Sequence, residues 1–327
     1  MHAEIAKHVT VDRRCWCGAK AARLLGMFPP VPECAHAEFP LVQCEGCGVF
    51  AIFPQPGDEE LSAAYGGEYY GRPGKKFVGS VSSVIGMFQG ERARRVAGLA
   101  PKGGRVLDIG CGRAGVLLQL RRRGFAVEGT ERSAEVAAQA PAGIPVHIGD
   151  LLDINLPPRS YDVITIWHVF EHVRQPAETI RKIRLLLKPG GRLVIAVPNA
   201  ESAQAERFGL HWFHHDPPRH LFGFGPKSLT RLLTQSGFDI ESMSTYSLEQ
   251  NPFGEIQSRL NARGTARDRL YNQLKGNSSD SIATRIGDLA AMAVLAIPAI
   301  VRSTMESSRG SGASLIVICR AGKRDAG

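Results

Sequence analysis

The pattern of apolar and polar residues changes near residue 104. From there on, short apolar runs typical of buried strands alternate with longer segments whose apolar residues recur at helical spacing. Seven strands are predicted in this way, at 105–110, 126–131, 145–150, 161–167, 192–198, 239–247 and 313–322. Because strands and helices alternate, we expect an α/β fold with a mostly parallel sheet covered by helices on both faces.

The pattern also divides the chain into parts. Residues 1–55 hold five of the seven cysteines and few long apolar runs, so they are predicted to form a small separate module. Residues 56–100 are predicted to be a helical connector, and residues 101–327 the main domain. Within that domain, residues 247–312 separate the last two predicted strands. This insertion is partly helical, and we expect it to form a lid or the face of a homodimer.

One apolar segment in the insertion raises the question of a membrane. Residues 289–301 are thirteen apolar residues between Asp288 and Arg302, with Pro298 among them. A bilayer core of about 30 Å takes roughly 20 residues to cross, so this run is too short to span it. We expect a buried or interfacial helix kinked at Pro298, which leaves peripheral membrane contact open.

The net charge limits which partners are expected, and the cysteine content limits the expected cellular compartment. A net charge of +9 favours acidic partners such as nucleic acid, anionic membranes and phosphorylated molecules. A soluble protein with a basic solvated face explains the same charge. The chain has no basic strip interleaved with aromatic residues that would stack bases, so nucleic acid is not the expected partner. Seven cysteines without a signal-peptide-like start favour a reducing, cytoplasmic location.

Candidate chemistry begins at the end of the first predicted strand, in LDIGCGRAG. Gly110, Gly112 and Gly115 allow a tight turn and a close approach of the backbone to a ligand. The helix that follows points its first N–H groups at that ligand. Glycine spacing of this kind fits a dinucleotide fingerprint as well, so it does not identify the ligand alone.

Three carboxylates at strand ends sharpen the prediction. Asp108 lies two residues before the first glycine, where an acid favours a cationic ligand over a pyrophosphate. Glu131 ends the second predicted strand, where a carboxylate can accept both ribose hydroxyls. Asp150 ends the third, where it can accept from an adenine amino group. A cation, a ribose and an adenine together describe S-adenosylmethionine.

Longer stretches carry a resemblance to a known family. They are VLDIGCGRAG, VEGTERS, HIGDLLD, YDVITIWHVFEHV, LLLKPGGRLVIAVPNAES and HWFHHDPPRHLFGFGPKSLTRLLTQSGF. Residues 100–246 resemble the class I S-adenosylmethionine-dependent methyltransferases, in particular the group with ubiquinone-pathway O-methyltransferases and sugar methyltransferases. The resemblance implies a Rossmann-like seven-stranded sheet with an antiparallel last strand. It implies cofactor contacts from Asp108, Gly110, Gly112, Glu131 and Asp150, with Trp167 and His168 near the methionine end.

The chain departs from the family pattern at two places. Ala114 stands where the usual tight run has its third glycine, and Gly115 follows one residue later. The acid expected at the ribose is Glu131, one methylene longer than the more common aspartate. We expect cofactor binding to survive both changes.

The N-terminal cysteines form two short pairs, CWCG and CEGCG. Four thiolates at tetrahedral corners make a closed structural zinc site, so Cys15, Cys17, Cys44 and Cys47 are the predicted ligands of a zinc-ribbon-like module. The first pair is C-x-C, which is tighter than usual, and Cys34 or His36 could replace a member of it. Metal-free buried thiols and a redox pair are the alternatives.

The stretch HWFHHDPPRH (211–220) has several interpretations. Its four histidines could bind a metal, and its Asp-Pro-Pro resembles the motif of nucleic-acid amino-methyltransferases. That motif follows the fourth strand of those enzymes, however, and here it follows the fifth with an arginine in place of the aromatic residue. A loop on the substrate side of the cofactor pocket is the preferred interpretation, with a purely structural loop as the alternative.

Methyl transfer to a hydroxyl is helped by a base, and histidine serves near neutral pH. His168 and His172 are four residues apart after the fourth strand, so both are expected to face the pocket. His172 and His215 are the candidate bases.

The sequence thus predicts an S-adenosylmethionine-dependent methyltransferase. The expected acceptor atom is an oxygen, with carbon as the alternative, on a small-molecule, saccharide or lipid-linked acceptor. A nucleic-acid methyltransferase and a non-catalytic cofactor-binding scaffold are the competing hypotheses.

Overall fold

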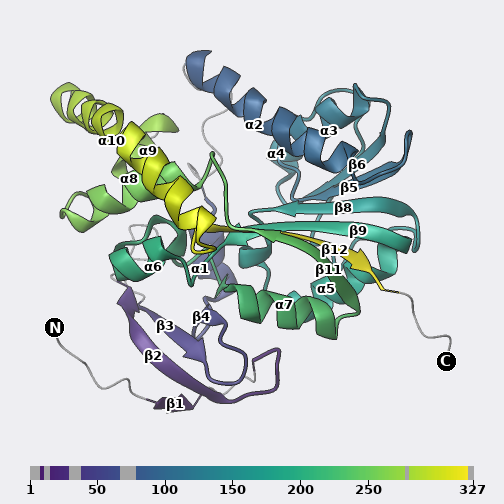
Figure 1. Ribbon diagram of the computed structural model, residues 1–327, viewed down its shortest axis with the longest axis horizontal. Coiled ribbons are helices and arrows are strands. Elements are labelled where there is room, and N and C mark those ends of the chain that lie inside the picture. The colour runs from purple at the N-terminus through teal and green to yellow at the C-terminus, as the bar shows by residue number, and fades with distance from the viewer. Residues whose placement is uncertain (1–7, 11–14, 29–37, 67–78, 277–279, 323–327) are drawn as a thin grey trace. The chain divides into compact units, whose positions relative to one another are not determined.

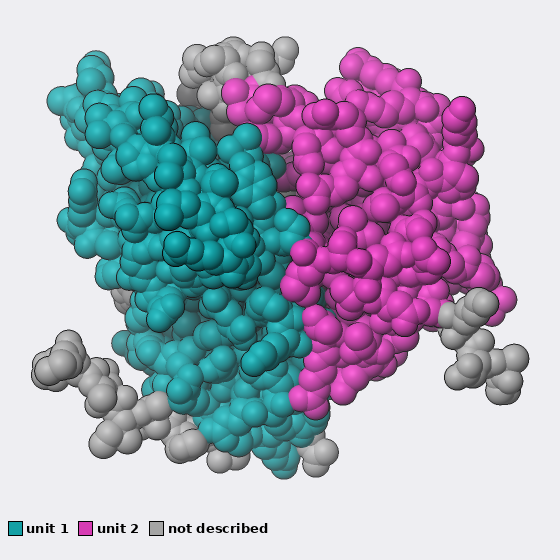
Figure 2. Space-filling view, in the orientation of Figure 1, with its two compact units in different colours: residues 1–77, 198–229, 244–315 teal, residues 78–197, 230–243, 316–327 magenta. Residues whose placement is uncertain are grey.

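The computed structural model describes residues 8–10, 15–28, 38–66, 79–276 and 280–322. The chain divides into two compact units, which Figure 2 shows in different colours. Unit 1 comprises residues 1–77, 198–229 and 244–315, and unit 2 comprises residues 78–197, 230–243 and 316–327. Each unit is therefore assembled from segments that lie far apart in the sequence.

Unit 2 is built on a seven-stranded sheet (Figure 1). In spatial order its strands are β11 (Phe238–Ser244), β12 (Ser314–Ala321), β9 (Leu187–Pro198), β8 (Tyr161–Trp167), β5 (Arg105–Ile109), β6 (Ala126–Glu131) and β7 (Val146–Ile148). The five strands from β9 to β7 pair in parallel. β12 runs antiparallel to β9. The N–H of Asn199, directly after β9, donates to the carbonyl of Ala313, directly before β12. The predicted Rossmann-like sheet with an antiparallel last strand is confirmed.

Helices cover both faces of this sheet, with α2 and α3 on one face and α5 on the other (Figure 1). The helical elements are α2 (Gly79–Ala97), α3 (Gly115–Arg121), α4 (Ala134–Ala137), the 3₁₀ turn η1 (Phe170–His172), α5 (Pro176–Leu186) and α7 (Pro226–Gln235). Ala93 and Val96 of α2 are fully buried in one apolar cluster with Leu117 and Leu120 of α3. Because of this apolar stripe α2 belongs to unit 2, so the segment 56–100 is not a single connector.

Unit 1 contains a five-stranded antiparallel sheet. Its strands are β1 (His8–Thr10), β2 (Ala21–Phe28), β3 (Phe39–Cys44), β4 (Phe50–Ile52) and β10 (Phe222–Gly223). Phe222 on β10 pairs with Ala51 on β4, so the edge of the N-terminal sheet is completed by residues that follow the HWFHHDPPRH stretch. The N-terminal module is thus not closed by residues 1–55 alone.

The helices of unit 1 come mainly from the predicted insertion. They are α1 (Asp58–Ala64), α6 (Ala203–Phe208), the 3₁₀ turns η2 (Gly209–His211) and η3 (Phe213–His215), α8 (Asn251–Ala262), α9 (Arg269–Leu274) and α10 (Ile282–Ser308). One apolar cluster joins the last three, with Ile256 and Leu260 from α8, Leu270 from α9 and Ala299 from α10.

α10 is longer than the apolar segment on which its prediction rests. It has 27 residues and continues through Pro298. By length and apolar content alone it is long enough to cross a bilayer, so the limit set by thirteen residues was wrong. The helix is not a buried core helix either, because its buried residues form one narrow stripe. That stripe consists of Asp288, Ala299, Ser303 and Glu306.

Candidate functional site

The glycine-rich turn joins β5 to α3 in unit 2. Gly110 and Gly112 have positive φ angles of +67° and +55°, which glycine adopts without strain. A Cβ on Gly110 would lie 2.5 Å from Cγ2 of Val169, so the turn passes directly against the segment after β8. At Gly112, no atom of the described residues lies within 4 Å of where a Cβ would be. The turn therefore leaves open space at Gly112, where a ligand can approach the backbone.

The residues after the turn form the start of α3, which packs against α2. Ala114 precedes the helix with a φ of +57°, in the position where the family pattern has glycine. The side-chain amide of Gln89 on α2 occupies the space that a Cβ on Gly115 would need. No motif in the sequence marks Gln89, because the packing of α2 sets its position.

Asp108 lies beneath the turn and is 4% exposed. Its neighbours in the sheet are Thr165 on β8 and Gly129 on β6. The hydroxyl of Thr165 donates to Oδ1 of Asp108 at 2.5 Å. Burial raises the pKa of Asp108 to about 6, although the Thr165 hydrogen bond and the charge of Arg92 act in the opposite direction. A further cation near this carboxylate would stabilise its ionised form.

Glu131 ends β6 and holds the glycine turn in place. Its Oε2 accepts from the backbone N–H of Gly112 at 3.0 Å, and its Oε1 accepts from the N–H of Ser133 at 3.1 Å. An ionised carboxylate offers about four lone-pair directions, so each oxygen can accept a further hydrogen bond. The carboxylate thus links the end of β6 to the turn and has capacity for hydroxyl groups.

Asp150 follows β7, the strand next to β6. It is half-buried, and its Oδ1 accepts from the N–H of Leu152 at 3.0 Å. This bond uses one oxygen of the carboxylate and fixes the loop after the strand. Asp150 therefore lies at the same carboxyl edge of the parallel strands as Glu131.

Trp167 ends β8 and is 9% exposed. Its indole Nε1 is buried and has no hydrogen-bond partner among the residues that the structure describes. The guanidinium of Arg92 lies 5.3 Å from the centre of the ring, within cation–π range. Arg92 thus acts on both Trp167 and Asp108, and it is a second α2 residue that the sequence analysis missed.

His168 and His172 differ from the expected arrangement. His168 has a φ of +53°, and its backbone N–H donates to Ala196 at 2.8 Å. His172 lies in the 3₁₀ turn η1 and is half-buried. An α-helical spacing therefore does not align the two rings. Nδ1 of His168 instead lies 3.8 Å from a carboxylate oxygen of Glu171.

The third candidate side chain of the reaction, His215, belongs to unit 1. Its ring lies 5.2 Å from the rings of Phe28 and Trp212, measured between centroids. Burial and the nearby charge of Arg267 lower the pKa of His215 to about 3. The imidazole is therefore neutral at neutral pH and is a weak base.

Arg219 and Trp212 of HWFHHDPPRH fix this loop within unit 1. Arg219 donates from Nε to both carboxylate oxygens of Asp216, at 3.1 and 3.0 Å, and from Nη1 to the carbonyl of Ala64 at 3.0 Å. Trp212 is 1% exposed and anchors an apolar cluster. Among the described residues, His211, His214 and His215 belong to no group of possible metal ligands, and His220 does so only with residues outside this stretch, so the four histidines do not form one metal site together.

Unit 1 also contains a cavity of about 370 Å³ beside this loop. Leu25, Leu41 and Phe50 from the sheet supply apolar walls, and Glu201, Glu206 and His215 supply polar groups. Its volume lies in the range of small-molecule sites.

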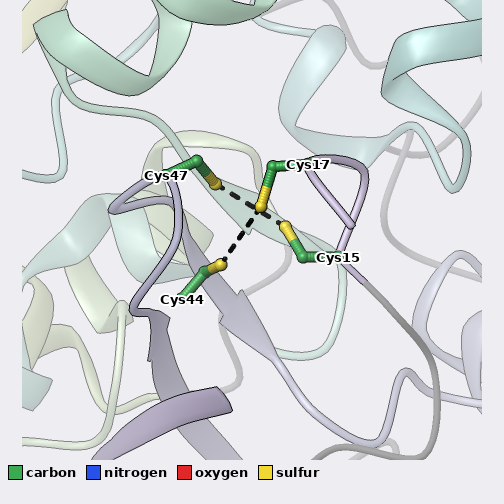
Figure 3. Close-up of side chains that lie close together, drawn as sticks. All are labelled: Cys15, Cys17, Cys44 and Cys47. Carbon is green, nitrogen blue, oxygen red and sulfur yellow. Dashed lines mark hydrogen bonds between the residues drawn. The ribbon is translucent and has the colours of Figure 1, made fainter. Parts of the chain in front are cut away.

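The four predicted zinc ligands are brought together in unit 1. Figure 3 shows the side chains of Cys15, Cys17, Cys44 and Cys47 converging from two loops. The Sγ atoms of Cys15 and Cys47 are 3.6 Å apart, as are those of Cys17 and Cys44, and all four lie within 4.8 Å of one another. Tetrahedral zinc with Zn–S distances of about 2.3 Å requires sulfurs about 3.8 Å apart, so the donor set fits this ion. Cys34 and His36 lie outside the described residues.

The loops that present these thiols are tight. Gly18 and Gly48 follow the two pairs with φ angles of +87° and +77°. The N–H of Gly18 donates to Cys15, and the N–H of Gly48 donates to Cys44. A Cβ on Gly46 would lie 2.7 Å from Cβ of Ala19, so the two loops pass in close contact.

Comparison with known proteins agrees with the geometry of unit 2. Residues 89–243 match the family model described as a methyltransferase domain. Over 106 residues the chain is 35% identical to a ubiquinone biosynthesis O-methyltransferase of Aeromonas salmonicida, covering 30% of this chain and 44% of that protein. Over 165 residues it is 29% identical to the enzyme of the same name from Ralstonia nicotianae, covering 46% and 68%. The chain spans about half the length of several relatives that it matches.

A solved structure supports the fold. Phosphoethanolamine N-methyltransferase 2 of Haemonchus contortus, in complex with S-adenosylmethionine, matches with a TM-score of 0.50 and 16% identity. The match covers 72% of this chain and 52% of that chain. The family match, the named relatives and the fold agree that residues 89–243 form a methyltransferase domain similar to those of S-adenosylmethionine-dependent methyltransferases.

Proposed function

We propose that this chain transfers the methyl group of S-adenosylmethionine to an oxygen atom of a small-molecule, saccharide or lipid-linked acceptor. The observation that carries the proposal is the turn at Gly112, which is open to a ligand and held between the buried Asp108 and Glu131. The choice of oxygen is supported by the O-methyltransferase names of the relatives, and carbon is the alternative acceptor atom.

The residues at the carboxyl edge of the sheet suit the parts of this cofactor. Gly110 and Gly112 would let the backbone approach it, and Glu131 has the capacity to accept from ribose hydroxyls. Asp150, on the next strand along, would accept from the adenine amino group. Asp108 would favour the positive charge of the cofactor.

Trp167 and His168 would line the methionine end. The buried indole N–H of Trp167 has no partner in the described residues, which fits a group that a ligand satisfies.

When bound, S-adenosylmethionine supplies a methyl carbon that its sulfonium makes reactive toward an oxygen. Transfer would form a C–O bond as the C–S bond breaks, and the acceptor hydroxyl would give up its proton to a base of the protein. We assign the removal of this proton to His172, which lies on the segment directly after Trp167 and His168. His215 is the weaker candidate, since a histidine of pKa about 3 is poorly matched to proton transfer near neutral pH.

The cavity in unit 1 has the chemistry of a site for a hydroxylated small molecule. Its apolar walls from Leu25, Leu41 and Phe50 would cover a ring, and Glu201 and Glu206 would accept from hydroxyl groups. Such a mixture fits hydroxylated rings, which include phenols and saccharides.

We further propose that Cys15, Cys17, Cys44 and Cys47 hold a structural zinc ion. Four thiolates leave no open position on the metal, so its role would be to fix the two loops and not to take part in methyl transfer.

Cofactor binding is the first test. Calorimetric titration with S-adenosylmethionine should show binding to the full chain. Glu131→Gln should weaken it at least tenfold, because a carboxylate bond to a hydroxyl is replaced by a weaker amide bond. Glu135→Gln removes an exposed carboxylate four residues away and is the matched control. Equal affinity for both variants would remove Glu131 from the proposed site.

Label transfer tests the acceptor. Methyl-labelled S-adenosylmethionine is incubated with the protein and a lysate separated into small-molecule, saccharide, lipid, protein and nucleic-acid fractions. Label in one of the first three fractions supports the proposal, and label in nucleic acid or protein contradicts it. Cofactor binding without transfer to any fraction would favour a scaffold.

A further inference from the structure

The outer face of α10 is apolar and exposed. Ile282, Val294 and Ile297 are 76%, 75% and 74% exposed, and Ile286 and Val301 are 62% and 53% exposed. Single exposed apolar residues are normal on a protein surface, but a row of them along one helix marks an interaction site. Figure 1 shows α8 and α9 along α10 in the same unit. We call the row formed by Ile282, Ile286, Val294, Ile297 and Val301 the outer face of α10.

The opposite side of α10 fixes the helix lengthwise on unit 1. Arg269 donates from Nη2 to Oδ1 of Asp288 at 2.6 Å and from Nε to Oδ2 at 2.8 Å. Near the other end, Arg207 forms an ion pair with Glu306. A helix that crossed a bilayer would have to break both ion pairs, and it would carry their charges into the hydrocarbon core. The attachment at both ends therefore favours a helix that lies on a surface over one that spans a membrane.

Around α10 the acidic side chains are mostly buried, whereas several arginines are exposed. Five acids occur between residues 251 and 309. Four of them are buried, and the fifth, Asp280, is half-buried before the helix. The buried four are Glu255, Asp268, Asp288 and Glu306. Four arginines of the same segment are exposed, namely Arg263, Arg285, Arg302 and Arg309. The surface beside the outer face is therefore positive.

Two of these arginines flank most of the apolar row, since Ile286, Val294, Ile297 and Val301 lie between them and only Ile282 precedes Arg285. Arg285 and Arg302 lie 17 positions apart, which is about 25 Å at a rise of roughly 1.5 Å per residue. Arginine side chains can bury their methylene stems beside apolar surface and keep the guanidinium at the level of charged headgroups. A row of aliphatic side chains between two such arginines matches a bilayer surface with anionic headgroups.

We propose that the outer face of α10 docks on the surface of an anionic lipid bilayer, with Arg285 and Arg302 at the headgroups. A second copy of the chain is the less favourable occupant. In a two-fold contact each face meets an identical face, so exposed arginines would gather opposite arginines. Arg302 lies 4.0 Å from the buried Glu255, and among the described residues of 251–309 no acid is exposed to pair the facing arginines. Lipid phosphates supply the missing negative charge. This docking does not depend on the proposed methyl transfer.

The test is flotation of the full chain with vesicles. Phosphatidylcholine vesicles that contain phosphatidylglycerol should carry the protein upward, and vesicles of phosphatidylcholine alone should carry much less. Added salt should weaken the binding, since arginine–headgroup attraction is screened. Absence of flotation with the anionic vesicles overturns the proposal.

Variants locate the contact. The double variant Val294→Gln and Ile297→Gln should lose most of the vesicle binding, because it places polar groups on the outer face without touching the buried stripe. Leu185→Gln, on an exposed position of α5 in unit 2, is the matched control and should float like the wild type. Equal loss in the control, or no loss in the double variant, would place the membrane contact elsewhere.

A second pair of variants tests the charge. Arg285→Gln together with Arg302→Gln should reduce binding to anionic vesicles at least tenfold, whereas Arg181→Gln on α5 should not. Light scattering distinguishes a self-interface. A dimer that the change at Val294 and Ile297 dissociates, with no vesicle binding by the wild type, would show that a second copy covers this face.

Discussion

Substitution of the buried acid at the glycine turn has two opposite expected effects. Asp108→Asn removes a carboxylate whose burial raises its pKa from 3.8 to about 6. The folded state therefore binds more protons than the unfolded state between these values, and stability falls as pH rises through this window. The ionised carboxylate costs the folded protein about 3 kcal/mol above roughly pH 7 and about 1.5 kcal/mol near pH 5.

Asparagine keeps an oxygen that can accept from Thr165 but carries no charge. In the absence of cofactor, we expect Asp108→Asn to raise the free energy of unfolding by about 1–3 kcal/mol near pH 8, with a smaller gain near pH 5. Denaturant unfolding at the two pH values measures this difference. Glu178→Gln, which removes an exposed carboxylate on α5, is the control for a simple change in net charge.

Cofactor binding should change in the other direction. A unit charge about 4–8 Å from the carboxylate at an effective dielectric constant near 20 is worth roughly 2–4 kcal/mol. We expect Asp108→Asn to weaken binding of S-adenosylmethionine at least tenfold near pH 8. The wild type should bind more weakly as pH falls through about 6, because Asp108 becomes protonated. A variant that binds the cofactor as tightly as the wild type, at every pH, would refute the electrostatic role of Asp108.

Other predictions concern the thiols and histidines. Cys44→Ser should lose the bound zinc and lower the unfolding temperature. Cys319→Ser, at a buried thiol outside the cluster, should keep the metal. Elemental analysis of both proteins measures the zinc content, and equal zinc in the two variants would contradict the site. His172→Asn should lower turnover and remove an ionisation from the pH profile of kcat, and an unchanged profile would exclude it as the base. His215→Asn should leave that profile unchanged between about pH 5 and 8, since a pKa of about 3 puts its ionisation outside this range.

The central strands of the sheet, β5, β8 and β9, were predictable because they are buried on both faces. Short apolar runs such as YDVITIW and RLVIAVP are typical of strands in a parallel sheet that helices cover on both faces. Strand ends were less predictable. β9 begins at Leu187, five residues before the predicted strand, because Leu187 pairs with Tyr161 of β8 ahead of a shift in register. Pairing across strands, and not side-chain pattern, sets such ends.

The site was predictable where a residue lies in a strand or its turn. Asp108, Gly112 and Glu131 follow from strand ends, and in the structure Gly112 and Glu131 are joined by a hydrogen bond. Gln89 and Arg92 could not be found in the same way, since they reach the turn from a helix whose position depends on tertiary packing. The weak basicity of His215 could not be predicted from the sequence either, because its pKa depends on burial and on Arg267 from a distant segment.

The position of β12 has a consequence for the order in which the protein can fold during synthesis. The sheet of unit 2 has β12 between β9 and β11, although β12 is made after all the other strands. β11 therefore has no strand to pair with until the ribosome has completed residues 314–321. Unit 1 likewise combines residues 1–77 with residues as late as 315. Nascent chains that stop short of β12 should expose the edges of β9 and β11, and they would be substrates for chaperones until the last strand arrives.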